Sequence, residues 1–219
     1  MEFKTVQTTR DPLFNKALQL YDAQLNVGLT EEPEIFKQSL ENNMTQHDYV
    51  FLVGLENGEP ISLATAHYEA TTNSAFLIYL IALDRPDHDQ VLSATFNHVE
   101  KEINALAQLV HGRDNNFIMF EADTTFVDAN QALVDIMKHR KQFLYEQGFE
   151  KQERIHYLKP STSGKGIPVD LFIKTSIPLT KDIYGPSIKS NYILKYVFAN
   201  KMPRKIIYKL LVDMDLRKA

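Results

Sequence analysis

The hydrophobic pattern of the chain begins with the period of a strand and changes to the period of a helix. Residues 2–8 alternate the apolar Phe3 and Val6 with polar residues, which predicts a short strand. Apolar residues at helical spacing then follow Pro12, and again follow the polar start signal at residues 30–33. We therefore expect two helices before the main sheet.

A three-stranded meander is predicted next. Residues 49–55 are β-branched and aromatic, and they end at Asn57-Gly58, a dipeptide typical of tight hairpin turns. Residues 60–69 supply the returning strand. The run 75–83 is apolar throughout, as expected for a strand that is buried on both faces.

Helices and strands alternate in the rest of the pattern. The predicted elements are, in order, helix 89–109, strand 117–121, a helix from about 128 to 145, and strands 155–158 and 169–173. Gly148 is placed to end the second of these helices. This order predicts an α/β fold with a mixed, mostly antiparallel central sheet flanked by helices.

Composition narrows the class of protein. The chain has 219 residues, of which 44% are hydrophobic and 24% charged, as in ordinary globular domains. It contains no cysteine, which excludes a disulfide framework, a thiolate metal site and a cysteine nucleophile. The histidines show no metal-ligand spacing, so no metal is expected. Neither a secretory signal nor a membrane-spanning run is present, which favours a cytoplasmic location.

Charge separates the last part of the chain from the rest. From Lys181 onward nine basic residues face three acidic ones, a formal charge of +6, which leaves −10 for the remainder at a total of −4. Ile206, Ile207, Leu210 and Leu211 recur there at helical spacing. We expect residues 177–219 to form a basic amphipathic helical extension that packs on a domain of residues 1–176. The alternatives are a contact in a homodimer or an anionic surface.

Three sequence patches resemble the GCN5-related N-acetyltransferase (GNAT) family, and together they span about residues 49–173. After the buried strand, His88-x-x-Val91-x-Ser93 opens a helix where the family has Arg/Gln-x-x-Gly-x-Gly/Ala. Residues 145–149, Tyr-Glu-Gln-Gly-Phe, are similar to the family motif Tyr-Glu-x-x-Gly-Phe. Residues 155–173 resemble the closing pair of strands of a bacterial subgroup.

The resemblance implies the acyl-CoA N-acyltransferase fold, acetyl-CoA as co-substrate, and an amine of a small molecule or peptide as acceptor. Family members bind the coenzyme pyrophosphate with backbone amides at the positions of His88, Val91 and Ser93. They pair the pantetheine arm with the strand end that corresponds here to Ile81, Ala82 and Leu83. The ordinary alternative for His88 is an exposed loop histidine that binds no ligand. For the strand end, the alternative is that another strand pairs there.

Two residues are candidates for proton transfer. Glu121 ends a predicted buried strand, where burial would raise its pKa and suit it to accept the proton of an amine. Tyr145 matches the family tyrosine that protonates the leaving thiolate, although it stands one residue closer to Gly148 than in the family. The alternative interpretation of Glu121 is a solvated residue at a strand end. The alternative for Tyr145 is an amphipathic ring that packs at the end of a helix.

The pyrophosphate loop departs from the family pattern. Asp89 and Val91 take glycine-type positions, and Asp87 adds a second negative charge beside them. Two hypotheses therefore stand: an N-acetyltransferase, or a GNAT-fold binding or regulatory protein that has lost catalysis. Transfer of a longer acyl group is a variant of the first. No nucleic-acid partner is expected.

Overall fold

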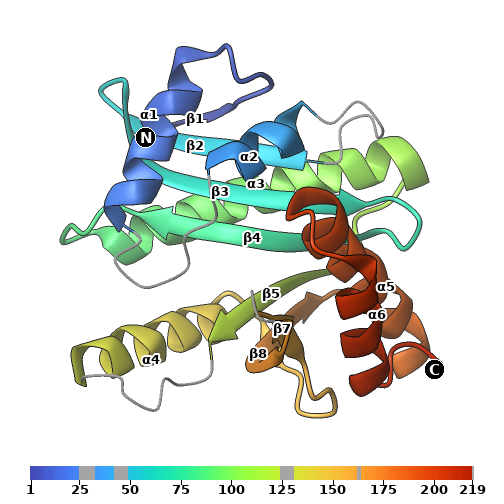
Figure 1. Cartoon of the computed structure of the whole chain (residues 1–219). Coiled ribbons are helices and arrows are strands. Elements are labelled where there is room, and N and C mark those ends of the chain that lie inside the picture. Colours follow the sequence, from blue (N-terminus) through green and yellow to red (C-terminus); the bar gives the residue numbers. More distant parts are fainter. Residues whose placement is uncertain (25–32, 42–48, 124–130, 162–163, 219) are drawn as a thin grey trace. The chain divides into compact units, whose positions relative to one another are not determined.

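The computed structural model describes residues 1–24, 33–41, 49–123, 131–161 and 164–218 (Figure 1). Most of the helix-start signal at 30–33 and the expected helix start near residue 128 lie outside these residues. The chain forms two compact units, Met1–Asn115 and Asn116–Ala219. The domain boundary expected after residue 176 remains a prediction, and residues 177–218 lie in the second unit.

The first unit contains an antiparallel sheet with the strand order β1-β2-β3-β4. Its strands are β1 (Glu2–Thr5), β2 (Tyr49–Glu56), β3 (Glu59–Glu69) and β4 (Ser74–Ala82). Asn57 and Gly58 join β2 to β3 with φ angles of 51° and 82°. A two-residue hairpin turn of this kind needs positive φ at both positions, so the turn predicted from Asn-Gly is confirmed.

Helices cover both faces of this sheet. α1 (Pro12–Gln24) and α2 (Pro33–Leu40) lie over one face, and the long α3 (His88–His111) lies over the other (Figure 1). Side chains alternate along β3 accordingly: Leu63 joins the core beneath α1, whereas the Ser62 hydroxyl lies 2.7 Å from that of Thr95 on α3. The core on the α1 side is aromatic, with Tyr21 packed edge-on against Phe36.

The second unit is built around a central strand, β8 (Gly166–Thr175). β5 (Phe117–Asp123) and β6 (Glu150–Lys151) pair with β8 in antiparallel fashion, and β7 (Leu158–Pro160) pairs with its first residues. α4 (Gln131–Glu146) ends before Gly148, whose φ of 84° is the left-handed conformation expected of a residue that ends a helix. The mixed, mostly antiparallel α/β fold expected from the sequence is confirmed.

One strand boundary was predicted wrongly. Residues 155–157 were expected to begin a strand, but the strand starts at Leu158. The Tyr157 N–H donates to the Ile155 carbonyl at 2.9 Å, which closes a three-residue turn. Alternating side chains are compatible with both conformations, so the periodicity did not distinguish them.

Three helical segments complete the second unit: α5 (Lys181–Ile193), the π-helix η1 (Leu194–Ala199) and α6 (Arg204–Asp213). The Tyr192 hydroxyl donates to the Leu158 carbonyl at 2.9 Å, and the Leu158 N–H donates to Met214 Sδ at 3.2 Å. The apolar stripe of this segment is buried at Ile188, Tyr192, Ile207, Leu210, Leu211 and Met214. The segment therefore contributes directly to the core of the second unit.

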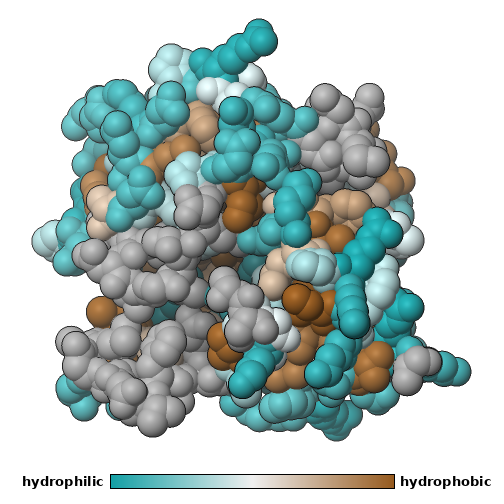
Figure 2. All heavy atoms as spheres, in the orientation of Figure 1, coloured by the Kyte–Doolittle hydropathy of each residue, from teal (hydrophilic) through white to brown (hydrophobic). Residues whose placement is uncertain are grey.

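The outer surface of this segment is mixed in polarity. Hydrophobic side chains lie among hydrophilic ones over α5 and α6 (Figure 2), and Ile183 and Phe198 are the large apolar residues most exposed there. Within the described part of the chain, no helix combines the length and the apolar character needed to cross a bilayer.

Candidate functional site

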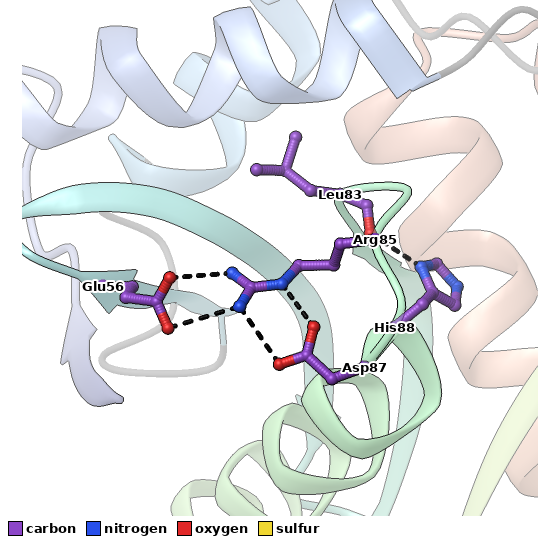
Figure 3. A network of polar contacts seen from close by, with 5 residues as sticks. All are labelled: Glu56, Leu83, Arg85, Asp87 and His88. Atoms are coloured by element: carbon purple, nitrogen blue, oxygen red, sulfur yellow. Dashed lines mark hydrogen bonds and ion pairs between the residues drawn. The ribbon is translucent and has the colours of Figure 1, made fainter.

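In the first unit, the turn before α3 is organised by Arg85. Its Nη1 donates to Glu56 Oε2 at 2.9 Å, and its Nη2 donates to Asp87 Oδ2 at 3.1 Å, while Nε also donates to Asp87 (Figure 3). These hydrogen bonds, first to Glu56 and then to Asp87, raise the pKa of the Arg85 guanidinium. These contacts of Arg85 join the end of β2 to the start of α3, and the two carboxylates balance the charge of the arginine.

His88 is held by the strand that precedes it. Its Nδ1 lies 2.8 Å from the Leu83 carbonyl oxygen (Figure 3). Since a carbonyl oxygen only accepts hydrogen bonds, Nδ1 is the donor in this contact. The contact fixes the orientation of the His88 ring at the start of α3.

The strand end expected to pair with the pantetheine arm is partly occupied. The Leu83 N–H donates to the Ile61 carbonyl at 2.9 Å, and its own carbonyl accepts from His88. In an antiparallel ladder, alternate residues direct their main-chain groups to the same neighbour. Ile81, opposite Leu63, therefore also faces β3, and Ala82 is the residue of the three whose main-chain groups are directed away from β3.

The first turn of α3 has mixed features for anion binding. The Asp87 carboxylate binds Arg85 and makes no cap hydrogen bond, so the N-cap side chain does not cap the first amides of this long helix. The exposed Asp89 opposes an anion at this position. Val91 is buried at 5% exposure and its N–H is already bound to the Asp87 carbonyl, while Ser93 is half-buried on the same helix.

β4 contains an irregularity that the sequence analysis missed. Thr65 pairs with Tyr79 and Ala66 pairs with Leu77, so Ile78 has no residue opposite it on β3. This β-bulge interrupts the pairing of β4 with β3 in the middle of the strand. Beside it, the buried Thr65 hydroxyl has no hydrogen-bond partner among the described residues. No apolar pattern reveals such an insertion, because β4 is buried along both faces.

In the second unit, Glu121 lies at the centre of a buried polar cluster. The Tyr157 hydroxyl donates to Oε1 at 2.7 Å, the Tyr196 hydroxyl lies 2.9 Å from both carboxylate oxygens, and Lys195 Nζ lies 2.8 Å from Oε2. The side chains of Glu121 and Lys195 are 8% and 9% exposed. We refer to Glu121, Tyr157, Lys195 and Tyr196 as the Glu121 cluster.

The expected direction of the Glu121 pKa was wrong. Burial by itself raises this pKa, but the charge and hydrogen bond of Lys195, with the hydrogen bond of Tyr157, outweigh burial and lower it. The pKa values of the Tyr157 and Tyr196 hydroxyls are raised well above the ordinary value, by burial first and by the Glu121 charge second. The carboxylate is therefore ionised at neutral pH and surrounded by donors.

Sequence reasoning missed the partners of Glu121 because two of them lie far along the chain. Lys195 and Tyr196 come from η1, and a π-helix inside a helical segment is a frequent feature of functional or strained sites. Tyr192 stacks edge-on against both Tyr157 and Tyr196. The one available signal was the lysine and tyrosine spacing of residues 192–196, which is equally typical of an ordinary amphipathic helix.

Tyr145 lies near the end of α4 and is half exposed, at 50%. Its ring packs edge-on against Phe172 at 5.4 Å between centroids. This contact matches the interpretation of a packed amphipathic ring, while a role in proton transfer stays a prediction. Among the described residues, no group of three or more His, Asp or Glu side chains is arranged to hold a metal ion.

Solved structures share this fold. A Bacteroides thetaiotaomicron protein assigned to the GNAT family of acetyltransferases superposes with a TM-score of 0.61, over 89% of this chain and 97% of its own, at 15% identity. The aminoglycoside 6'-N-acetyltransferase from Enterococcus faecium gives a TM-score of 0.55, over 82% and 99%, at 15% identity. An aminoglycoside 6'-N-acetyltransferase complexed with coenzyme A gives 0.56 over the same shares and at the same identity.

The fold therefore places the chain in one structural class: it has the fold of the GNAT acetyltransferases, as the sequence patches implied. The sequence itself matches no family model and no curated protein. At 15% identity the likeness concerns the fold, and the chemistry has to be argued from the residues of this chain.

Proposed function

We propose that this protein is an N-acetyltransferase that transfers the acetyl group of acetyl-CoA to a primary amine of a small molecule or peptide. The observation that carries the proposal is the β-bulge at Ile78 of β4. β4 leads to the first turn of α3, whose N-cap residue Asp87 makes no capping hydrogen bond with its side chain. A strand with an interrupted ladder followed by a helix N-terminus suits an acyl thioester whose carrier contains a pyrophosphate.

In the proposed reaction, the amine nitrogen attacks the thioester carbonyl carbon. A main-chain N–H at the bulge polarises the carbonyl oxygen, which becomes negative as the tetrahedral intermediate forms. The C–S bond then breaks, the amine nitrogen loses a proton to a base, and the coenzyme thiolate takes up a proton. No covalent enzyme intermediate is needed, so positioning provides much of the acceleration.

The proposal assigns coenzyme contacts to Ala82 at the strand end and to the first turn of α3. His88, Val91 and Ser93 lie at or near that turn. Tyr145 is the proposed proton donor to the thiolate. Glu121 is ionised and so able to accept a proton, but its lowered pKa makes it a weak base. The contacts of the Glu121 cluster favour a role of this carboxylate in holding the second unit together.

The test is a calorimetric titration of the full chain with acetyl-CoA, followed by measurement of thiol release with a panel of primary amines. Dissociation constants in the micromolar range, together with thiol release that depends on an amine, are the expected result. Absence of coenzyme binding at millimolar ligand would contradict the proposal and favour a fold retained for binding another partner. Binding without thiol release would show that the fold has kept the coenzyme and lost transfer.

A further inference from the structure

The second unit contains a cavity of about 260 Å³ between β8 and the segment of residues 151–157 that runs beside it. The Gln152 N–H donates to the Leu171 carbonyl at 2.8 Å, and the Val169 N–H donates to the Tyr157 carbonyl at 3.2 Å. Between these bonds β8 advances by Asp170 alone, whereas the facing segment runs through residues 153–156. The surplus chain arches away from β8 and leaves the cavity over Asp170.

The wall of this cavity carries charges of both signs. Asp170 is buried at 8% exposure; its Oδ2 lies 2.6 Å from Lys141 Nζ and its Oδ1 lies 3.2 Å from Lys151 Nζ. Lys151 Nζ also lies 3.2 Å from Glu153 Oε1. These hydrogen bonds, first to Glu153 and then to Asp170, raise the pKa of Lys151 and keep it cationic. Lys151, Glu153 and Asp170 line the cavity, and Lys141 pairs with Asp170 from outside the lining.

Hydrogen-bonding capacity remains on both kinds of group. A carboxylate has about four acceptor positions, and among the described contacts Asp170 and Glu153 use only part of theirs. Lys151 has three N–H donors and uses two of them on these carboxylates. The exposed His156 lines the same cavity with a ring that can donate or accept. The wall offers acceptors to a cation and donors to an anion within one small space.

We propose that this cavity binds a small zwitterion of the α-amino acid class, with its ammonium on Asp170 and Glu153 and its carboxylate on Lys151 and His156. An ion of one sign would meet repulsion from the wall groups of the same sign, whereas a zwitterion satisfies both the carboxylates and the ammonium group of the wall. The volume lies below the roughly 300–1,000 Å³ of sites for drug-sized ligands, which favours a ligand of amino-acid size.

The inference concerns residues of the second unit alone and does not depend on acetyl transfer. It is tested by titrating the full chain, without coenzyme, with three related probes. These are L-glutamine, 4-aminobutanamide, which lacks the α-carboxylate, and glutaramate, which lacks the ammonium group. We expect saturable binding of L-glutamine and affinities at least about tenfold weaker for both analogues, because each loses charge-assisted hydrogen bonds. No saturable binding, or equal affinity for an analogue, would overturn the proposal.

Variants locate the site. Glu153 has a side chain that is 75% exposed, so Glu153→Gln should leave the thermal stability unchanged and weaken L-glutamine binding about tenfold. Asp170→Asn should weaken binding at least as much, with its unfolding curve as a check that the protein is folded. Glu150→Gln is the matched control: Glu150 is exposed on β6 and does not line the cavity. An equal loss in Glu150→Gln, or no loss in Glu153→Gln, would place binding elsewhere.

Discussion

At the scale of single residues, Glu121 and Asp170 are both buried carboxylates whose neighbours come from distant parts of the chain. Burial alone would raise the pKa of Glu121, but the opposite charge of Lys195 lowers it below the ordinary value. Removing either member of such a pair leaves an uncompensated buried charge, which costs more than the intact pair contributes. The Glu121 cluster is therefore more important for the stability of the second unit than its few hydrogen bonds suggest.

We predict that Lys195→Met lowers the free energy of unfolding at neutral pH by about 3–5 kcal/mol, as for the loss of one partner of a buried ion pair. Glu121→Gln in the same chain should recover part of this loss. Urea unfolding followed by circular dichroism measures both. Lys209→Met is the control, because Lys209 is exposed on α6 and its replacement should change stability by less than about 0.5 kcal/mol. A similar small effect for Lys195→Met would mean that the pair does not form.

The same cluster predicts a pH dependence. The folded pKa of Glu121 is below its unfolded value of about 4.3, so the stability that it contributes is present above that value and is lost as the pH falls through the folded pKa. Below about pH 4.3, the wild-type protein should therefore lose unfolding free energy more steeply than Glu121→Gln. The unfolding free energy of both proteins is measured by denaturant titration at several pH values. If it falls equally steeply in the two proteins at acid pH, Glu121 is not preferentially ionised in the folded state.

A third residue-scale prediction concerns the loop before α3. Asp89 is exposed where a coenzyme phosphate is proposed to lie, so Asp89→Asn should tighten coenzyme A binding by about two- to fivefold, the effect of one charge at a helix N-terminus. Restoring glycine at Val91 as well, as the family pattern suggests, would remove a buried side chain and confuse the result. Asp22→Asn, an equal change of charge on α1, should leave calorimetric affinity unaltered. Unchanged affinity in both variants would contradict a phosphate site at this loop.

At the scale of elements, local chemistry decided where most helices and strands begin and end. The Asn57-Gly58 turn and the end of α4 at Gly148 were both predicted because positive φ restricts the choice of residue. The bulge at Ile78 and the arched segment at residues 153–156 could not be predicted, because each depends on what the neighbouring strand does. Both of these unpredicted features lie in the candidate sites.

Gly148 provides an element-scale prediction. A Cβ at this position would meet only the flexible end of Lys174, at 3.8 Å, so the cost of a substitution comes from the backbone and not from a clash. Gly148→Ala should lower the free energy of unfolding by about 1 kcal/mol, and Gly148→Asn by less, because asparagine tolerates the left-handed conformation better. Thermal unfolding of the two variants measures the difference. Equal losses would show that steric contact, rather than φ, sets the cost.

At the scale of the whole molecule, the basic segment that follows residue 176 belongs to the core of the second unit. Deleting residues 186–219 removes buried Tyr192, Tyr196, Ile207 and Met214 together with Lys195, the ionic partner of Glu121. Each large apolar side chain contributes about 1.5–3 kcal/mol when fully buried, so the loss is comparable with the whole stability of a domain. We predict that the truncated chain aggregates or unfolds at a markedly lower temperature than the full chain.

Differential scanning calorimetry with light scattering tests this prediction. As a control, Phe198→Ser changes an exposed apolar residue of the same segment and should leave the unfolding temperature nearly unchanged. A truncated chain that stays soluble and melts like the full chain, having lost only a dimer or an anionic contact, would show that the stripe serves a partner.

The sequence by itself determined the order of the elements, the hairpin at Asn57-Gly58, the amphipathic helices and, through three short patches, the fold of the GNAT acetyltransferases. The first three features rest on periodicity and turn chemistry, which act between residues close together in the chain, whereas the fold was implied by the resemblance of the patches to that family. Only the tertiary structure decided the bulge in β4, the cavity over Asp170 and the ionisation of Glu121. These features depend on contacts between distant segments, such as the pair formed by Glu121 and Lys195, which no local pattern encodes.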